Sequence, residues 1–225
     1  MRTSTAYFAV LGASLLVALI PITWPGLDLA VTAFFMQAHP PINPAQWLWV
    51  DWVNEYTPDV FRTTAILFLL GWIIASVVTR FRRHALVFAF LGFSIALGPG
   101  LATWALKEHT LRARPMDVVQ FGGTRQFTPA FVQAKQCSDN CAFTSGHAAC
   151  GFFLASLMLL APHRRWRWVV TGVMLGLAVS LARVSVGAHW LSDVLWALPV
   201  TLLTSGAVWL VLIQFYHPPL QHPRA

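Results

Sequence analysis

The sequence predicts an all-α, polytopic membrane protein, in which six transmembrane helices form a bundle and one more helix lies along the outer membrane surface. Two observations predict this fold class. First, 57% of the 225 residues are hydrophobic and only 10% are charged, whereas soluble domains carry about 25% charged residues. Second, the apolar residues gather in long segments separated by short arginine-rich connections. The length fits a single domain over residues 1–225.

Six segments are apolar enough to be transmembrane helices, which need roughly 20 apolar residues each. Their approximate ranges are 6–24, 61–79, 85–106, 147–161, 168–184 and 190–213. The first segment has the early arginine of a signal peptide. However, it lacks a clear cleavage site, and its apolar run is longer than that of a usual signal peptide. We therefore expect this segment to remain as a transmembrane helix.

The charged residues divide between the two sides of such a bundle. With the N-terminus in the cytoplasm, the cytoplasmic side receives arginines and no acidic residue: Arg2, Arg80, Arg82, Arg83, Arg164, Arg165, Arg167 and Arg224. The opposite side receives all eight acidic residues: Asp28, Asp51, Glu55, Asp59, Glu108, Asp117, Asp139 and Asp193. Arginine-rich short loops are typical of the cytoplasmic side. We therefore predict that both termini are cytoplasmic, and that the net charge of +7 reflects membrane topology rather than nucleic-acid binding.

The segment 25–60 is rich in aromatic residues that favour the headgroup region of a membrane. Within it, apolar residues fall at helical spacing: Leu27, Val31, Phe34, Phe35 and Ala38. This pattern favours an interfacial helix on the outer surface. The alternative is a plain loop packed on the bundle.

Lys107 and Arg114 flank the outer end of the third predicted span. The arginine guanidinium offers a planar fork to phosphate oxygens, and the lysine ammonium offers a point charge. Taken singly, either side chain is better explained by contact with lipid headgroups.

Ser145, Gly146 and His147 stand where a loop becomes the fourth predicted span. Thr144 or Ser145 can cap that helix, whose first backbone N–H groups lack partners and favour an anion. Gly146 lets the backbone approach a ligand closely. The alternative is an ordinary capped helix start with His147 facing the headgroups.

His189 and Asp193 are four residues apart and therefore share one face of a helix. An aspartate can hold one imidazole nitrogen and leave the other free as a nucleophile or base. A carboxylate inside an apolar segment is costly unless it is paired, so such residues commonly mark functional sites. Arg183 precedes the pair, and all three polar segments lie on the same predicted side. A purely structural His–Asp pair is the alternative.

Taken together, the segments 107–115, 144–147 and 182–193 resemble the three-part signature of the type-2 phosphatidic acid phosphatase (PAP2) superfamily. The family pattern is a lysine followed by Arg-Pro, then Pro-Ser-Gly-His, then Ser-Arg followed by a histidine and an aspartate. The sequence reproduces the order and the internal spacings. It departs at two positions, because Thr144 stands where the family has proline and Ala182 where it has serine.

The resemblance implies a bacterial membrane lipid phosphatase with a site built from these motifs. His189 would attack phosphorus and form a phosphohistidine, Asp193 would orient His189, and His147 would protonate the leaving lipid oxygen. The implied phosphate-binding residues are Lys107, Arg114, Ser145, Gly146 and Arg183. The resemblance implies no cofactor. Since no separate carboxylate cluster suits magnesium, we predict that activity needs no metal.

The expected partners are a phosphorylated lipid and the bilayer, without nucleic acid; the oligomeric state is not predicted. The resemblance places the chain in a bacterial inner membrane, with the site facing the periplasm. Candidate substrates are undecaprenyl pyrophosphate, lipid A, phosphatidylglycerophosphate and phosphatidic acid. Three alternatives share parts of this evidence: a phosphotransferase with a lipid acceptor, a vanadate-holding haloperoxidase-like enzyme, and a non-catalytic lipid-binding protein.

The outer segment 116–143 is a long loop, and loops of this length are usually functional or disordered. Its run from Phe121 through Cys141 is similar to bacterial lipid A phosphatases, which tilts the choice of substrate toward lipid A. Cys137 and Cys141 lie on the side expected to be oxidising and can form a disulfide there. Cys150, inside the fourth predicted span, is interpreted as a small packing residue.

Overall fold

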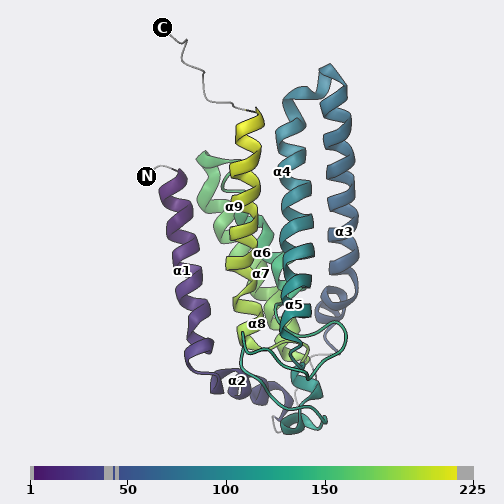
Figure 1. The fold of residues 1–225 in the computed structure, drawn as a ribbon, viewed down its shortest axis with the longest axis vertical. Coiled ribbons are helices and arrows are strands. Elements are labelled where there is room, and N and C mark those ends of the chain that lie inside the picture. The colour runs from purple at the N-terminus through teal and green to yellow at the C-terminus, as the bar shows by residue number, and fades with distance from the viewer. Residues whose placement is uncertain (1–2, 38–42, 44–45, 217–225) are drawn as a thin grey trace.

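The structure, a computed structural model, describes residues 3–37, 43 and 46–216 of the chain (Figure 1). Its α-helices are α1 (Thr3–Thr23), α2 (Gly26–Met36), α3 (Leu48–Val77), α4 (Ala85–Ile95), α5 (Thr103–Thr110), α6 (Gly146–Ser156), α7 (Arg165–Ser185), α8 (Leu191–Leu195) and α9 (Ala197–Tyr216). Short 3-10 segments are η2 (Thr79–His84), η4 (Pro115–Asp117), η5 (Val119–Phe121) and η6 (Pro162–Arg164), and η3 (Ala96–Ala102) is a π-helical turn. The described residues form no strand beyond one isolated bridge between Val118 and Arg125. The all-α prediction is confirmed.

Five helical segments are long and apolar enough to cross a membrane: Ser4–Thr23, Leu48–Val77, Thr79–Asp117, Pro162–Ser185 and Leu191–Tyr216. The predicted count of six is not confirmed, because the fourth predicted span, 147–161, is the 11-residue helix α6 followed by a turn. Most of α6 is buried between its neighbours. A turn then continues the segment to the arginine-rich connection that precedes α7.

The two ends of the bundle carry different segments of the chain. The α3–α4 and α6–α7 connections, which carry the arginine clusters, lie toward the upper end in Figure 1, with the start of α1 and the end of α9. The lower end holds α2, the end of α5, the loop after it, and α8. Arg2 and Arg224 lie outside the described residues. All three predicted motifs therefore lie at the end opposite the arginine clusters.

Helix α2 runs across the lower end of the bundle, as expected for the predicted interfacial helix (Figure 1). Its buried residues are Asp28 and Thr32, so a carboxylate faces the protein interior. Ala38, predicted to extend this helix, lies outside the described residues. Helix α3 begins at Leu48, well before the predicted start of the second span, and its first turns reach over the lower end of the bundle.

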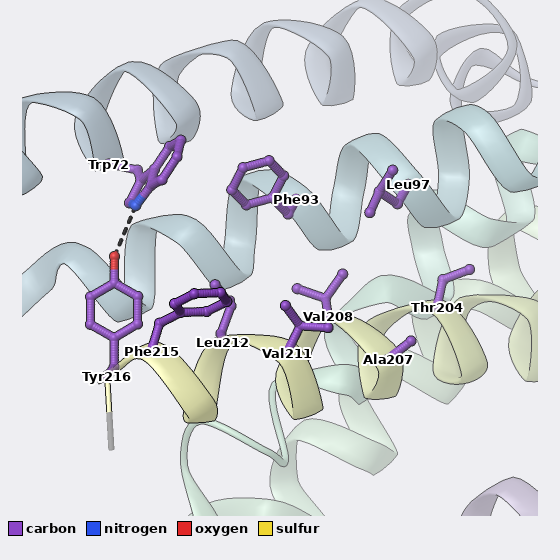
Figure 2. A pocket seen from close by; sticks show the side chains of 10 residues that line it. All are labelled: Trp72, Phe93, Leu97, Thr204, Ala207, Val208, Val211, Leu212, Phe215 and Tyr216. Atoms are coloured by element: carbon purple, nitrogen blue, oxygen red, sulfur yellow. Dashed lines mark hydrogen bonds between the residues drawn. The ribbon is translucent and has the colours of Figure 1, made fainter. Parts of the chain in front are cut away.

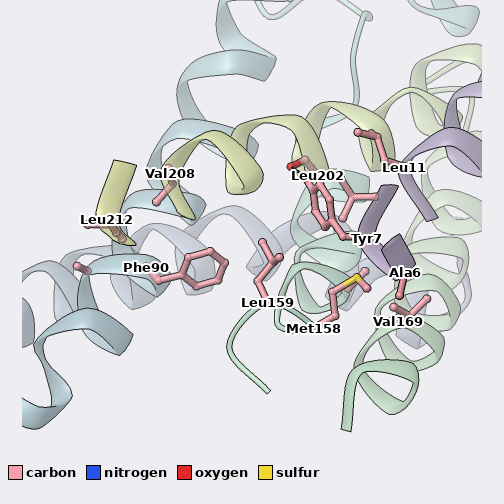
Figure 3. Packing of buried hydrophobic residues seen from close by; sticks show 12 residues of the cluster. Ala6, Tyr7, Leu11, Phe90, Met158, Leu159, Val169, Leu202, Val208 and Leu212 are labelled. Atoms are coloured by element: carbon pink, nitrogen blue, oxygen red, sulfur yellow. Dashed lines mark hydrogen bonds between the residues drawn. The ribbon is translucent and has the colours of Figure 1, made fainter. Parts of the chain in front are cut away.

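The main apolar core joins α1, α4, α7 and α9 with the segment that ends α6 (Figure 3). Phe90, Met158 and Leu202 are fully buried there. Helices α6 and α7 approach especially closely: a Cβ added at Gly172 would lie 2.2 Å from the Ala155 backbone nitrogen. Small residues allow such close helix contact. This contact holds the end of α6 against the first half of α7.

A cavity of about 620 Å³ lies between α9 and the α3–α4 pair (Figure 2). Its lining is apolar and includes Phe93, Leu97 and Val211, without a charged residue. At one end the Trp72 Nε1–H donates a hydrogen bond of 2.9 Å to the Tyr216 hydroxyl. This cavity contains none of the groups that phosphate chemistry requires.

Candidate functional site

The three predicted motifs meet at the lower end of the bundle. Lys107 is on α5, Gly146 and His147 begin α6, Arg183 ends α7, and His189 and Asp193 flank the start of α8. The turn between α7 and α8 passes through Gly187, whose φ of 68° lies in the left-handed region that favours glycine. The Ala188 and His189 N–H groups donate to the Arg183 carbonyl across this turn. The turn therefore holds His189 next to Arg183.

Ser145 joins the second motif to the third. Its Oγ accepts a hydrogen bond of 3.3 Å from the Ala148 N–H, so Ser145 is the N-cap of α6. Its own N–H donates 3.1 Å to the Asp193 carbonyl. The hydroxyl is buried and already used as a cap, which makes the backbone at Gly146 the more available part of this motif.

His189 and Asp193 form the expected pair. The His189 Nδ1 lies 3.5 Å from Asp193 Oδ2, and both side chains are essentially inaccessible to solvent. Burial, together with the nearby cations Arg183, Lys107 and Arg114, holds the pKa of His189 well below its ordinary value. The imidazole is therefore neutral at physiological pH, and its Nε2 is the nitrogen that points away from Asp193. A neutral imidazole with one free nitrogen is the form that a nucleophile requires.

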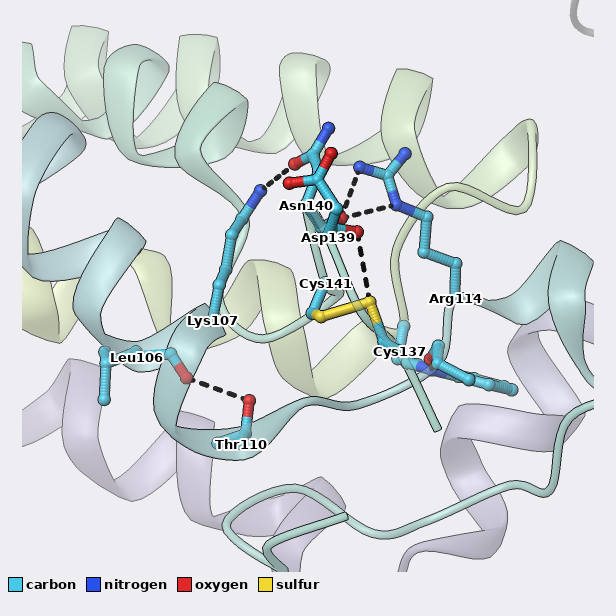
Figure 4. The surroundings of a disulfide bond; sticks show 10 residues. Leu106, Lys107, Thr110, Arg114, Cys137, Asp139, Asn140 and Cys141 are labelled. Carbon is cyan, nitrogen blue, oxygen red and sulfur yellow. Dashed lines mark hydrogen bonds between the residues drawn. A yellow bond between two sulfur atoms is a disulfide. The ribbon is translucent and has the colours of Figure 1, made fainter. Parts of the chain in front are cut away.

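Two of the predicted phosphate ligands converge on Asn140 (Figure 4). The Lys107 Nζ donates 2.7 Å to Asn140 Oδ1, and Arg114 donates from Nε and NH2, at 3.1 and 2.9 Å, to the Asn140 carbonyl. Figure 4 shows Lys107 and Arg114 approaching Asn140 from opposite sides. Two separate cations are therefore aimed at one small volume.

Asn54, in the first part of α3, contacts two other site residues, Arg183 and His147. Arg183 NH1 donates to Asn54 Oδ1, and His147 Nε2 lies 3.2 Å from the Asn54 carbonyl. Since a carbonyl can only accept, this contact places a proton on His147 Nε2. Burial and the charge of Arg183 lower the pKa of His147 to about 3. His147 is thus neutral while no anion is bound.

A cavity of about 630 Å³ opens beside these groups, between α3, η3, α5 and α6. One end is polar and includes Lys107, Asn140 and His147. The rest is largely apolar, lined among others by Phe61, Ala65, Ile66, Leu69, Ile95 and Trp104. His189 and Arg183 do not line it and lie deeper. A molecule with an anionic head and a hydrocarbon chain matches this division of polarity.

Sequence reasoning missed Arg112, which lies within the first motif but was not singled out. Its guanidinium is fully buried and donates 2.7 Å to Asp193 Oδ1 and 2.7 Å to Asp28 Oδ2. The signal for Asp28 was present, because Asp28 stands among the apolar residues of an amphipathic helix. Asn54 and Asn140 carried no signal, because neither an exposed-looking helix position nor a loop asparagine stands out in a sequence.

Residues 87–216 match the sequence model of the PAP2 superfamily. The chain belongs to the PAP2 superfamily. It is 33% identical to the lipid A 4'-phosphatase of Francisella tularensis subsp. novicida over 77% of this chain and 80% of that protein. It is 33% identical to the lipid A 4'-phosphatase of Rhizobium leguminosarum over 60% of this chain and 64% of that protein. Phosphatidylglycerophosphatase B of Escherichia coli is 23% identical over 71% of this chain and 74% of that protein. No solved structure matches the chain.

The PAP2 match begins within α4, so it covers every predicted motif but neither Asp28 nor Asn54. Both of these residues nevertheless contact motif residues directly. The N-terminal helices α2 and α3 are therefore part of the site's construction and not only part of the membrane anchor.

The loop between α5 and α6 of this PAP2 protein forms a second, polar pocket of about 300 Å³. Its polar lining includes Asp117, Thr124, Arg125 and Gln136. Asp139 lines both this pocket and the larger cavity, so the two adjoin. In the structure Cys137 and Cys141 are joined by a disulfide, which closes the short segment carrying Asp139 and Asn140 (Figure 4). That ring holds the segment shared by the pocket and the cation site.

Among the described residues, no three His, Cys, Asp or Glu side chains come together in a group that could hold a metal ion. Asp28 and Asp193, the two buried carboxylates near the site, are both bonded to Arg112. The positive charge of the site is thus supplied by Lys107, Arg114 and Arg183.

Proposed function

We propose that this PAP2-family lipid phosphatase removes a phosphate from a lipid through a phosphohistidine on His189, without a metal. The observation that carries the proposal is that a neutral imidazole, paired with Asp193, lies close to three cations, of which Lys107 lines the polar end of a largely apolar cavity. Phosphoryl transfer depends mainly on positioning and on stabilising charge, and this site supplies both.

In the proposed first step, Nε2 of His189 attacks phosphorus and the bond between phosphorus and the lipid oxygen breaks. Lys107, Arg114 and Arg183 hold the phosphate oxygens, taking positions that asparagine oxygens occupy in this structure. His147 gives a proton to the leaving oxygen. The negative charge of the bound phosphate raises the pKa of His147 and so lets it carry that proton.

In the second step, water attacks the phosphohistidine while His147 takes its proton. The bond between Nε2 and phosphorus breaks, inorganic phosphate leaves, and both histidines return to their starting states. Asp193 Oδ2, which lies 3.5 Å from Nδ1 of His189 in this structure, accepts a hydrogen bond from that nitrogen during the reaction, so that Nε2 remains the reacting nitrogen.

For the substrate, we propose a phosphorylated glycolipid of the lipid A type. The named relatives at 33% identity support this choice. The polar pocket that adjoins the cation site through Asp139 also supports it, because a sugar ring next to the phosphate needs hydrogen-bonding groups, whereas an isoprenoid pyrophosphate or phosphatidic acid does not. The apolar part of the cavity would take an acyl chain.

The experiment is phosphate release in detergent micelles containing EDTA, with lipid A, undecaprenyl pyrophosphate, phosphatidylglycerophosphate and phosphatidic acid compared. We expect activity in the wild type, none in His189→Ala, and near wild-type activity in His109→Ala, which removes an exposed histidine outside the site. Activity that is abolished by EDTA and restored by magnesium would contradict the metal-free mechanism. Loss of lipid phosphate without release of inorganic phosphate would indicate transfer to a lipid acceptor.

The substrate choice has its own test in Arg125→Ala, with Lys135→Ala as the matched control. Both residues are exposed cations of the same loop, but only Arg125 lines the polar pocket. We expect Arg125→Ala to lower kcat/KM for lipid A while leaving phosphatidic acid unchanged. Equal effects of the two variants, or equal effects on both lipids, would show that the polar pocket does not select the substrate.

A further inference from the structure

Arg112 is the most completely bonded charged residue near the site. Its Nε donates 2.7 Å to the Thr128 carbonyl, NH1 donates to Ser192 Oγ and Asp193 Oδ1, and NH2 donates to Asp28 Oδ2. Its guanidinium carbon also lies 5.2 Å from the centre of the Trp190 ring. A planar guanidinium held in this way has one orientation.

Asp28 supplies the other half of this network from α2. Its Oδ1 accepts 2.8 Å from the Ser192 N–H, and its Oδ2 accepts 2.7 Å from the Ser192 hydroxyl in addition to the bond from Arg112. Asp28, Arg112, Ser192 and Asp193 are all fully buried. Buried charges of this kind persist only when they are paired and hydrogen-bonded, as they are here.

The network determines how Asp193 faces His189. Arg112 holds Oδ1 of Asp193, and the Trp190 N–H donates 2.8 Å to Oδ2, so both carboxylate oxygens are fixed. Oδ2 is the atom 3.5 Å from His189 Nδ1. Arg112 is paired with Asp28 as well as with Asp193. The charge of Asp28 offsets part of the charge of Arg112, so the electrostatic potential at His189 is more negative than it would be with Arg112 and Asp193 alone.

We propose that Asp28 and Arg112 are positioning residues, which act through Asp193 to hold and tune His189 and so tie helix α2 to the reacting imidazole. The proposal rests on the proposed function, in which His189 is the nucleophile. Neither residue touches the cavity in which the phosphate would bind, so both should affect the rate of the chemical step rather than substrate affinity.

A positioning role predicts opposite changes in the pH profile. The charged groups that face His189 are Asp193 with Arg112 behind it, Arg183 from α7, Lys107 from α5, Arg114 from the loop after α5, and His147 from α6. Asp28→Asn leaves Arg112 less compensated and makes it harder to protonate His189. Arg112→Gln leaves Asp193 uncompensated and makes protonation easier. The acid limb of the rate profile should therefore move to lower pH in the first variant and to higher pH in the second, by about one unit each.

The experiment measures kcat, KM and the pH profile of the full-length protein in micelles, with the most active lipid of the panel as substrate. We expect Asp28→Asn to lower kcat by about 100-fold, as small misplacements of reacting groups do, with KM unchanged. Thr32→Val is the matched control: Thr32 is also buried on α2, its hydroxyl has no hydrogen-bond partner, and valine keeps its shape. We expect this variant to behave like the wild type.

A double variant tests whether Asp28 acts through Asp193. Adding Asp28→Asn to Asp193→Asn should cause no further loss, because the group that Asp28 positions is already removed. If Arg112→Gln does not fold, Ser192→Ala replaces it as the second variant and should lower kcat without a rise in KM. Three outcomes would overturn the proposal, provided that the wild type is active and the variants fold. They are additive losses of kcat in the double variant, a rise in KM without a fall in kcat, and an acid limb that does not move. An inactive wild type would instead overturn the proposed function.

Discussion

Asn140 stands between Lys107 and Arg114, where the phosphate is proposed to bind (Figure 4). Its φ of 45° lies in the left-handed region, which asparagine, aspartate and glycine tolerate better than other residues. Its side chain and backbone oxygens both accept from cations. At the scale of single residues, the two oxygens of Asn140 therefore hold Lys107 and Arg114 in place, in positions that the oxygens of a phosphate are proposed to take.

Two substitutions of Asn140 should have opposite effects on substrate affinity. Asn140→Asp places a carboxylate against Lys107, which competes with phosphate and should raise KM by about 10-fold or more. Asn140→Gly keeps the backbone conformation and releases Lys107, so KM should stay the same or fall. Steady-state kinetics and inhibition by inorganic phosphate measure both. A fall in KM for the aspartate variant would contradict the placement of the phosphate at Lys107.

The two histidines predict a bell-shaped dependence of rate on pH. As pH falls, His189 becomes protonated and loses its nucleophilic nitrogen; since its pKa is held well below 6.5, activity should persist below that pH. As pH rises, His147 loses the proton that it acquires with the bound phosphate, and kcat should fall. His147→Gln should slow the reaction and flatten the alkaline limb. A rate that rises steadily from about pH 5 to 9 would sink the assignment of roles.

The residues with intrinsic chemistry could be predicted from the sequence, whereas their supports could not. Histidine, arginine and lysine at these spacings predicted a phosphate site, and the structure brings their segments to one end of the bundle. Asp28 and Arg112 are 84 positions apart, and only the folded chain shows that they meet. Their contact depends on how α2 crosses the bundle, which no local pattern specifies.

At the scale of helices, the packing of α6 against α7 sets the position of His147 relative to Arg183. The contact depends on Gly172, because any side chain there would run into the backbone at Ala155. The fourth predicted span, 147–161, is helical only in part, because α6 ends at Ser156 and a turn continues the segment. A helix buried among its neighbours can be shorter than one that faces lipid, and both look equally apolar in the sequence.

Helix α3 shows the opposite difference. It begins at Leu48, well before the apolar segment that predicted it. The prediction started later because the first turns of α3 contain polar and aromatic residues, which lower the mean hydropathy. These first turns carry Asn54, which contacts Arg183 and His147. A method that finds spans by apolar content therefore misses the part of the helix that reaches the site.

Gly172→Ala should lower both the thermal stability and the activity, because the added methyl would lie 2.2 Å from a backbone nitrogen and force α6 and α7 apart. Gly12→Ala is the matched control: it lies within α1, nothing is within 4 Å of its Cβ position, and alanine favours a helix more than glycine does. Thermal unfolding in detergent and phosphate release measure both variants. Equal stability of the two would show that the α6–α7 contact can relax at no cost.

At the scale of the whole molecule, the arginine-rich connections lie at one end of the bundle and the candidate site at the other (Figure 1). From the positive-inside rule we predict that the arginine end is cytoplasmic and that the site lies at the outer face. The disulfide between Cys137 and Cys141 fits an oxidising compartment on that side.

A cysteine-labelling experiment tests this orientation. Thr124→Cys should react with a membrane-impermeant maleimide in intact spheroplasts, and Arg82→Cys should react only after permeabilisation. The native cysteines give a low background, because Cys137 and Cys141 are joined and Cys150 is buried. Labelling of the residue 82 variant in intact cells would reverse the predicted topology.

The three members of the buried Asp28–Arg112–Asp193 network are made at different times during synthesis of the chain. Asp28, in α2, is synthesised early and Arg112 much later, while Asp193 comes only with the short helix α8. Until then, the guanidinium has one of its two carboxylates, and the proposed nucleophile has not been made. If His189 is the nucleophile, as proposed, a nascent chain gains both its complete charge network and its nucleophile only after the turn that follows α7 and helix α8 have been made.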